Sequence, residues 1–479
     1  PATQTDLNGQ VSSFSYDALC REIYRKRPGD YEEWRGYEKL GKPTAQYQWL
    51  RQSAPGGQSA TRWKSDYLDG FGRSYRTTSS GPSSSSFVVV DRTYNERWGL
   101  ASQSEPHFDD ETAVWKSFSY DKLDRLIRTT NPDKTSSTVS YGLGASGTDE
   151  LLVTTLTDEI GHQVIETSDA NGKRVARSRM NDKSAVTTQY QRDGLGRIVR
   201  IIDPKGNRWV YDYDGLGRRI SVNDPDLGTW TYDYDKASRL TRQQDAKGQV
   251  TRLSYDVLSR LIKKEVTVTS GLETTTNSYD QSRSGFFNVG QLTSAVRTAG
   301  GKSFSQTYDY DAAGRLARRT DLGVNGRDYT QRFEYWPDST LKRKQLADGS
   351  WTGSYIYDRT GRLYSIANAN APSATEPAKY IASIAYNARG QTTEIAYGNG
   401  VTSSFTYNDA RGFLTRVLTK NTTQTLLDLK YTRNNKGMIT AISSPDSTRA
   451  WTYDYDALDR LVSARNSGSS GESRTYAYD

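Results

Sequence analysis

One short phrase recurs along this 479-residue chain: an aromatic strand runs into Tyr-Asp, a turn follows, and an Arg leads into a second strand. In the clearest stretch the phrase begins at Tyr213, Tyr234 and Tyr255, so successive copies lie 21 residues apart. A fixed period of this length is the sequence sign of a repeat architecture. Further clear copies begin at Tyr16, Tyr120, Tyr310, Tyr357 and Tyr455.

The residues before each Tyr-Asp alternate between aromatic and polar. Trp230, Tyr232 and Tyr234 alternate with Thr231 and Asp233, which is the period-2 pattern of a strand with one aromatic and one polar face. Tyr, Trp, Thr and Val also suit pleated surfaces. Each copy therefore contributes strands rather than helices.

The turn after Tyr-Asp follows from its residue types. Asp at the first turn position can bind nearby backbone amides, and Gly at the fourth accepts a positive φ. A type I turn with a Gly bulge would place Tyr310 opposite Leu316 and pair Asp311 with Arg315. Copies with Ser or Asp in place of Gly should have more strained turns or turns of another type; these are Asp124, Ser238, Ser259 and Asp459.

A second turn signal, such as 203–207 or 245–248, separates consecutive copies, so each unit reads as strand, turn, strand, turn. The chain is expected to form a long antiparallel meander that coils, because sheets twist and large open sheets curl. Residues 31–40 are the one candidate for a short helix. Loops are expected at 79–86, 369–377 and 466–471.

Composition supports a repeat protein with a thin core. Only 34% of residues are hydrophobic while Tyr alone numbers 33, so each unit should bury amphipathic aromatics. The 64 basic and 56 acidic residues are spread along the chain, which argues against a nucleic-acid groove despite a net charge of +8. The single cysteine excludes an intramolecular disulfide. The sequence contains neither a run of about 20 apolar residues nor a signal peptide.

Motifs that could carry chemistry have a plainer interpretation. Residues 142–147 match G-x-G-x-x-G, but a strand-like segment follows where a nucleotide site needs a helix, so a Gly-rich loop is expected. His107 and His162 lack the spacing of zinc ligands. Cys20 stands where other copies have Gly, Ser or Asp, which indicates a turn thiol rather than a nucleophile.

The acids and aromatics of the repeat also have structural explanations. Asp212, Asp214, Asp454 and Asp456 lack the further acids and closing Glu of an EF-hand loop, and are expected to be turn and Arg partners. Aromatic stripes could stack on sugars or bases, but they recur in every copy and so favour packing. We expect no catalytic residues, no metal and no cofactor.

The phrase Tyr-Asp-x-x-Gly-Arg-Leu at 310–316 and 357–363 resembles the RHS/YD-repeat family, over nearly the whole chain and most strongly from about 190 onward. The copies are most similar to bacterial Rhs polymorphic toxins and the B/C components of insecticidal toxin complexes. The resemblance implies a β-ribbon coiled into a spiral β-solenoid shell, a partial cage that shields a C-terminal toxic cargo before delivery. The family's self-cleaving region has no counterpart here, so no catalytic residue is carried over.

The resemblance also implies the surroundings of the chain. Its partners would be a cargo toxin domain, further shell segments and other toxin-complex or secretion-system components, and a bacterium would secrete or deliver it. We expect an irregular N-terminal or capping region at 1–115 and the repeat shell at 116–479. The chain stops inside a copy, so residues 455–479 are expected to continue into a partner or further segment. The alternative is a cell-surface adhesion module that binds glycans.

The wall-building role would fall on the repeat positions. These are Tyr213, Asp214, Gly217, Arg218, Tyr234, Asp235, Arg239, Tyr255, Asp256, Arg260, Tyr310, Asp311, Gly314, Arg315, Tyr357, Asp358, Gly361, Arg362, Tyr455, Asp456 and Arg460.

Overall fold

The computed structural model describes residues 2–56, 58–146, 149–181, 184–269, 271–346, 348–368, 378–468 and 472–478. Within these ranges the secondary structure consists of 41 β-strands and one 3-10 helix, η1 (Ser447–Arg449). The chain forms two compact units. Unit 1 comprises Pro1–Val139, Asp158–Gly161 and Arg332–Asp479, and unit 2 comprises Ser140–Thr157 and His162–Gln331.

Strands β1–β30 belong to one 30-stranded sheet and β31–β41 to an 11-stranded sheet. The first sheet contains β1 (Ala2–Thr5), β2 (Val11–Tyr16), β3 (Glu22–Arg27), β4 (Tyr31–Glu38), β5 (Tyr47–Gln52), β6 (Arg62–Leu68), β7 (Ser74–Ser80), β8 (Phe87–Tyr94), β9 (Leu100–Ser104), β10 (His107–Phe108), β11 (Trp115–Tyr120), β12 (Leu126–Thr130), β13 (Ser136–Ser146), β14 (Asp149–Thr157), β15 (Gln163–Ser168), β16 (Arg174–Asn181), β17 (Ser184–Arg192), β18 (Ile198–Ile202), β19 (Arg208–Tyr213), β20 (Arg219–Asp224), β21 (Gly228–Tyr234), β22 (Leu240–Gln244), β23 (Val250–Tyr255), β24 (Leu261–Val268), β25 (Gly271–Tyr279), β26 (Leu292–Ala299), β27 (Lys302–Tyr310), β28 (Leu316–Val324), β29 (Arg327–Tyr335) and β30 (Leu341–Lys344).

The second sheet contains β31 (Tyr355–Tyr357), β32 (Leu363–Ala367), β33 (Lys379–Tyr386), β34 (Thr392–Tyr397), β35 (Thr402–Tyr407), β36 (Leu414–Lys420), β37 (Thr425–Arg433), β38 (Ile439–Ser443), β39 (Trp451–Tyr455), β40 (Leu461–Asn466) and β41 (Arg474–Thr475).

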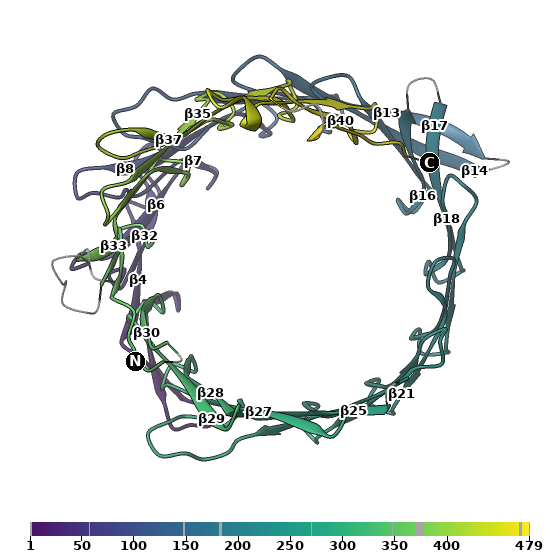
Figure 1. The fold of residues 1–479 in the computed structure, drawn as a ribbon. Coiled ribbons are helices and arrows are strands. Elements are labelled where there is room, and N and C mark those ends of the chain that lie inside the picture. Colours follow the sequence, from purple (N-terminus) through teal and green to yellow (C-terminus); the bar gives the residue numbers. More distant parts are fainter. Residues whose placement is uncertain are drawn as a thin grey trace. The chain divides into compact units, whose positions relative to one another are not determined.

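Consecutive strands pair antiparallel, so the sheets are meanders of hairpins. In β21 and β22 the partners are Thr231↔Gln244 and Tyr232↔Gln243, and the register shifts by a bulge just before the Tyr of the turn. The N-terminal part varies this pattern, because β8 pairs with both β9 and β10. Figure 1 shows β21, β25 and β27 of unit 2 as parts of one layer of strands. The predicted fold class, an all-β antiparallel meander of hairpin repeats, is confirmed.

The meander has little aliphatic core. Among the described residues the buried hydrophobic side chains are Val89, Val222, Ile384, Leu458 and Ala464. The aromatic face of β21 is half-buried and its polar face is exposed, as the period-2 pattern predicted. Hydrogen-bonded ladders and half-buried Tyr rings therefore replace a deep core, which is consistent with the low hydrophobic content.

Two local predictions were wrong. Residues 31–38 form strand β4 between β3 and β5, not a helix. Gly36 lies against the Trp49 ring, where an added Cβ would come within 2.3 Å of it, so cross-strand packing decides the conformation. Residues 142–146 continue strand β13 instead of forming a Gly-rich loop, while Gly147 lies outside the described residues.

The loop predictions have mixed outcomes. Strand β7 extends to Ser80, so the first loop is confined to 81–86. The loop predicted at 369–377 lies outside the described residues, as do 469–471 of the third loop.

Candidate functional site

The Asp of each copy organises its own turn. Asp214 Oδ1 accepts hydrogen bonds from the amides of Leu216 (3.0 Å) and Arg218 (2.9 Å), and Oδ2 accepts one from Arg218 Nε (2.7 Å). The Arg218 amide is the largest of the contributions that hold the pKa of Asp214 below its ordinary value. The Gly217 amide donates to the Asp214 carbonyl, with φ of +79° at the glycine.

The same Asp–Arg arrangement recurs in both units. The Arg Nε–Asp Oδ2 bond joins 21 to 17, 73 to 69, 125 to 121, 197 to 193, 239 to 235, 260 to 256, 362 to 358 and 460 to 456. The predicted register at Tyr310 is also confirmed: Tyr310 pairs with Leu316, and Arg315 Nε lies 2.7 Å from Asp311 Oδ2.

Copies without Gly at the fourth position use the same turn. Cys20, Asp124, Ser238, Ser259 and Asp459 all have φ between 59° and 65°. Of the two alternatives predicted for these turns, the more strained turn is observed and another turn type is not. L-residues in this left-handed region carry a cost of roughly 1–2 kcal/mol, which the Asp hydrogen bonds offset.

Each copy is also tied to the next one. The Tyr234 hydroxyl donates to the Arg219 carbonyl of the preceding copy (2.8 Å), and the Arg218 guanidinium lies 4.9 Å from the Tyr234 ring centroid. Arg218 Nη1 donates to the Asp235 carbonyl (3.0 Å). One Arg therefore closes its own turn, stacks on the next Tyr and binds the next turn.

This linkage, which we call the turn spine, repeats at other predicted positions. The Tyr hydroxyls at 213, 255, 310, 357 and 455 bind the carbonyls of residues 198, 240, 292, 341 and 439. Arg239, Arg260, Arg362 and Arg460 stack on the Tyr rings at 255, 279, 386 and 478. Sequence reasoning found the pair within a copy but missed these links. The regular 21-residue spacing of Tyr and Arg was the signal for them.

Two more of the acids considered for a metal, Asp454 and Asp456, are engaged by neighbouring side chains. Asp454 Oδ2 accepts a hydrogen bond from Ser463 Oγ (2.7 Å) and lies 2.8 Å from Arg465 Nη1. Asp456 binds Arg460 within its own turn. Both acids therefore serve cross-strand or turn contacts.

One irregular stretch of unit 2 contains a buried charge. Asp309 is fully buried and accepts hydrogen bonds from Arg283 Nη1 (2.7 Å), Arg318 Nε (2.7 Å) and Asn288 Nδ2 (2.9 Å). Burial by itself pushes its pKa upward, but the three donors together hold the pKa below the ordinary value. Through Arg283 and Asn288, Asp309 fixes residues 280–291, where the repeat is interrupted.

Unit 1 has two kinds of sheet edge. We call the edge formed by the Tyr-Asp turns the YD-turn edge, and the edge formed by the turns between copies the linking-turn edge. The YD turns at 358–362, 408–412 and 434–438 lie against linking segments earlier in the chain. Arg359 Nη1 donates to the Ser83 carbonyl (3.1 Å), and the Tyr357 amide donates to the Gly56 carbonyl (2.9 Å).

The strongest charge contacts at this junction involve two cations. Arg411, only 12% exposed, lies 3.3 Å from Asp133 and 3.2 Å from Glu159. Lys436 Nζ lies 2.6 Å from Asp158 and 2.5 Å from Asp459. Burial alone lowers the pKa of Lys436, but the two carboxylates outweigh it and raise the pKa. The contacts with Asp133, Glu159 and Asp158 fasten one row of hairpins to another within unit 1, while Asp459 belongs to the next YD turn of the same row as Lys436.

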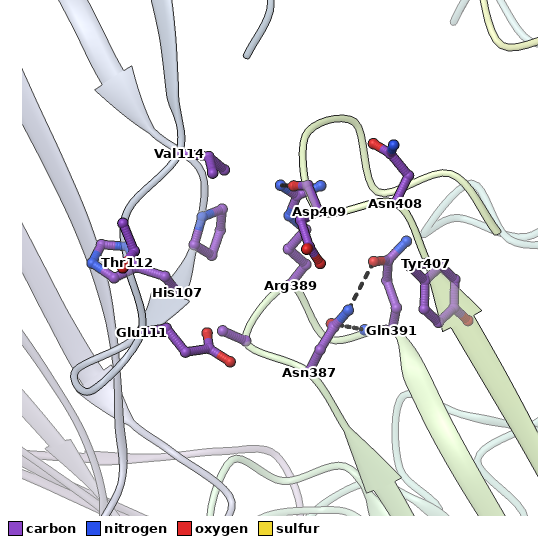
Figure 2. Close-up of a pocket in the computed structure, with 12 residues that line it drawn as sticks. His107, Glu111, Thr112, Val114, Asn387, Arg389, Gln391, Tyr407, Asn408 and Asp409 are labelled. Carbon is purple, nitrogen blue, oxygen red and sulfur yellow. Dashed lines mark hydrogen bonds between the residues drawn. The ribbon is translucent and has the colours of Figure 1, made fainter. Parts of the chain in front are cut away.

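A cavity of about 410 Å³ lies at the same junction (Figure 2). One wall is the segment from Pro106 to Val114, which includes His107 and Glu111; the other is formed by 387–391 and 407–409. Hydrogen bonds within its lining join Asn387 and Gln391, two amides that cannot abstract a proton. The lining also includes His107, Glu111 and Asp409, so the cavity presents a mixed polar surface.

The helix η1 has three residues, and the described residues contain no helix that could cross a bilayer.

Comparisons with known proteins agree with the repeat. The family model for the RHS repeat matches residues 192–229, 213–250, 234–275 and 433–470. No curated protein matches the chain. The solved structures that resemble it include TcdB2-TccC3 (16% identity, TM-score 0.83, 97% of this chain and 28% of that chain) and TcdB2-TccC3-Cdc42 (15%, 0.82, 97% and 31%).

A Tc holotoxin pore from Photorhabdus luminescens is also similar (14% identity, TM-score 0.81, 97% of this chain and 30% of that chain). At these identities the likeness shows the fold. The chain spans less than a third of the length of these structures.

Proposed function

We propose that this chain is a wall segment of a toxin shell that encloses a toxic cargo before delivery. The proposal is supported by the RHS-repeat matches within the chain and by the similarity of its fold to solved Tc toxin components. The fold match over 97% of the chain carries the proposal. In this view the repeat Tyr, Asp, Gly and Arg residues are wall builders. Residues 1–115 would begin or cap the wall, and 116–479 would form its regular part.

The turn spine suits a wall. Each turn is closed by its own Asp–Arg pair and bound to the next by Tyr and Arg, so the ribbon holds itself without a covering layer. One face of β21 exposes Thr and Asp side chains, which would not adhere to an unfolded chain. The segment would act as a container, with the toxic chemistry in the cargo.

Partners and location follow as part of the proposal. One similar structure is a Tc holotoxin pore, so we propose that this chain assembles with further toxin-complex components. A bacterium would secrete or deliver that assembly. The chain spans under a third of its solved relatives, so the cargo and the remaining shell would come from sequence beyond this wall segment.

Protease protection of the cargo tests the proposal. In the protein as its gene encodes it, Arg411→Gln combined with Lys436→Gln should loosen the row junction and expose the cargo to protease. The matched control Arg242→Gln removes an ion pair with the exposed Asp233 and should leave protection unchanged. The proposal of enclosure would be refuted if protease cleaved the cargo equally fast in the wild-type protein, the double variant and the control.

A second candidate function rests on one observation. The exposed rings of Phe71 and Trp98 lie 4.8 Å apart in neighbouring turns of unit 1, a geometry that could stack on a sugar ring. A glycan-binding adhesion module would lose glycan-array binding on Phe71→Ser. Binding unchanged by that substitution would rule this site out.

A further inference from the structure

We infer that a pocket on one face of β5 and β6 in unit 1 binds an acidic saccharide, a sugar of one or two rings that carries a carboxylate. The pocket has a volume of about 430 Å³, which lies within the roughly 300–1,000 Å³ of small-molecule sites. Its lining includes four aromatic side chains and three charged ones: Tyr47, Trp49, Trp63, Tyr67, Glu38, Arg51 and Arg359. We call it the aromatic pocket. The inference goes beyond the proposed wall role and does not depend on it.

The pairing of β5 and β6 gathers the aromatic side chains on one face. Alternate residues of a strand point to the same side of a sheet, so Tyr47, Trp49 and Arg51 share a face. Across the ladder Tyr47 pairs with Tyr67, and Arg51 pairs with Trp63. The ring centroids of Tyr47 and Tyr67 are 5.3 Å apart. The face is therefore an aromatic platform on which a ring-shaped ligand can pack.

Trp49 is held in place by three neighbours. Gly36 pairs with Trp49 across β4 and β5, and a Cβ at residue 36 would come within 2.3 Å of the indole ring. The missing side chain lets the indole lie against the backbone of β4. The indole Nε1 donates to Glu38 Oε1 (3.3 Å), and the Arg51 guanidinium lies 4.9 Å from the ring centroid. Trp49 thus positions both an acid and a cation at the pocket.

The two cations of the pocket have spare hydrogen-bonding capacity. Arginines that close the Tyr-Asp turns bind an Asp, as Arg73 Nε binds Asp69 Oδ2 (2.8 Å). Arg51 and Arg359, by contrast, form no ion pair with any residue that the structure describes. Arg359 Nη1 donates to the Ser83 carbonyl (3.1 Å), but its Nε is buried without a partner in the described part of the chain. A buried donor left unpaired is costly, so the pocket favours a ligand that brings an anionic acceptor.

The charges lie at opposite ends of the pocket. Arg62 Nη1 donates to a backbone carbonyl of the turn that contains Arg359 (3.3 Å), and Arg51 pairs with the residue that follows Arg62. The two cations therefore share one end of the face. Glu38 pairs with Tyr47, which precedes Arg51 by four residues, or roughly 13 Å along β5. A ligand that meets both ends needs a carboxylate at one end and hydrogen-bond donors at the other.

An acidic saccharide meets these requirements. Its carboxylate can bind the guanidinium groups by charge-assisted hydrogen bonds, its hydroxyls can donate to Glu38, and its ring can pack on Trp63. A free amino acid fits poorly, because its ammonium and carboxylate are attached to the same carbon. A nucleobase fits less well than a sugar, because it has no hydroxyl groups for Glu38, Thr61 and Ser65, which also line the pocket.

Calorimetric titration of the full chain tests the inference, with sialyllactose as the acidic saccharide and lactose as its neutral counterpart. We expect sialyllactose to bind and lactose to bind at least 10-fold more weakly. Arg51→Gln and Arg359→Gln should each weaken sialyllactose binding roughly 10- to 100-fold. The matched control is Arg252→Gln on β23 of unit 2, since Arg252 is exposed as Arg51 is, and it should leave binding unchanged. Unchanged circular dichroism of Arg51→Gln would show that the fold is intact.

Four results would overturn the inference. These are no binding of sialyllactose at millimolar concentration, equal affinities for sialyllactose and lactose, affinity unchanged by both pocket substitutions, and tighter binding of adenosine monophosphate than of sialyllactose. Loss of sialyllactose binding on Phe71→Ser would place the sugar at the Phe71–Trp98 pair and would also overturn it. Protection of the cargo from protease is a separate measurement, so the proposed enclosure can fail while the aromatic pocket binds its ligand.

Discussion

Asp309 offers the sharpest test of how the irregular stretch of unit 2 is stabilised. Asp309→Asn keeps the shape of the side chain but removes its charge, and it turns an amide group toward one of the guanidinium donors. Hydrogen bonds between charged groups are worth about 1.5–3 kcal/mol each, and Arg283 and Arg318 keep some solvent contact. We therefore expect a loss of about 3 kcal/mol in the free energy of unfolding.

The repeat supplies a matched control for this substitution. Asp233 precedes the Tyr of its copy just as Asp309 does, but its side chain is 60% exposed and its partner Arg242 lies 3.2 Å away. Asp233→Asn should cost about 0.5 kcal/mol or less. Urea unfolding and amide exchange at 280–291 measure both variants. Equal shifts in the two would refute the argument that burial makes the difference.

The same group sets a pH dependence. Because the pKa of Asp309 is held below its ordinary value in the folded state, its contribution is present above the unfolded pKa and is lost as the pH falls through the folded pKa. The wild-type protein should therefore lose stability in acid more steeply than Asp309→Asn. Parallel acid profiles would contradict this assignment.

Five further substitutions probe the turns, the link between copies and the row junction. Cys20→Gly should raise the free energy of unfolding by about 1 kcal/mol by relieving a positive φ, and Gly72→Ala should lower it comparably; urea midpoints moving the other way would contradict this. Tyr255→Phe should cost about 1 kcal/mol through its hydroxyl bond to the preceding copy, as measured by urea unfolding. Arg411→Gln should cost about 3 kcal/mol and speed amide exchange at 131–135, while Arg416→Gln, which removes a more exposed pair, should leave that exchange unchanged.

The fold was predictable because its signals are local. Alternating aromatics fix each strand, and Asp with a residue at positive φ fixes each turn, so hairpins follow without long-range information. The prediction of a helix at 31–40 was wrong because Gly36 packs against the Trp49 ring of the next strand. No local sequence pattern shows this contact. The strand at 142–146 was missed because its glycines imitate a loop.

The row junction could not be predicted, since Arg411 and Glu159 are 252 residues apart and belong to different rows. The buried Asp309 was hidden for a related reason. Its partners Arg283 and Asn288 come from an insertion that lacks the repeat, so no period places them beside it.

Two groups of residues in the repeat have separate roles: one fixes the ribbon and the other meets neighbouring surfaces. Asp, Arg and Tyr bind backbone atoms of their own and neighbouring copies, so they fix the ribbon whatever lies beyond it. The residues between Asp and Arg vary more, with Leu216, Phe71, Ala313 and Lys122 as examples. Where the edge is covered they are buried or paired with acids, as Leu458 and Lys436 are. The identity of these turn residues can therefore change which surface meets the YD-turn edge while the ribbon stays the same. One repeat can in this way build rows with different neighbours.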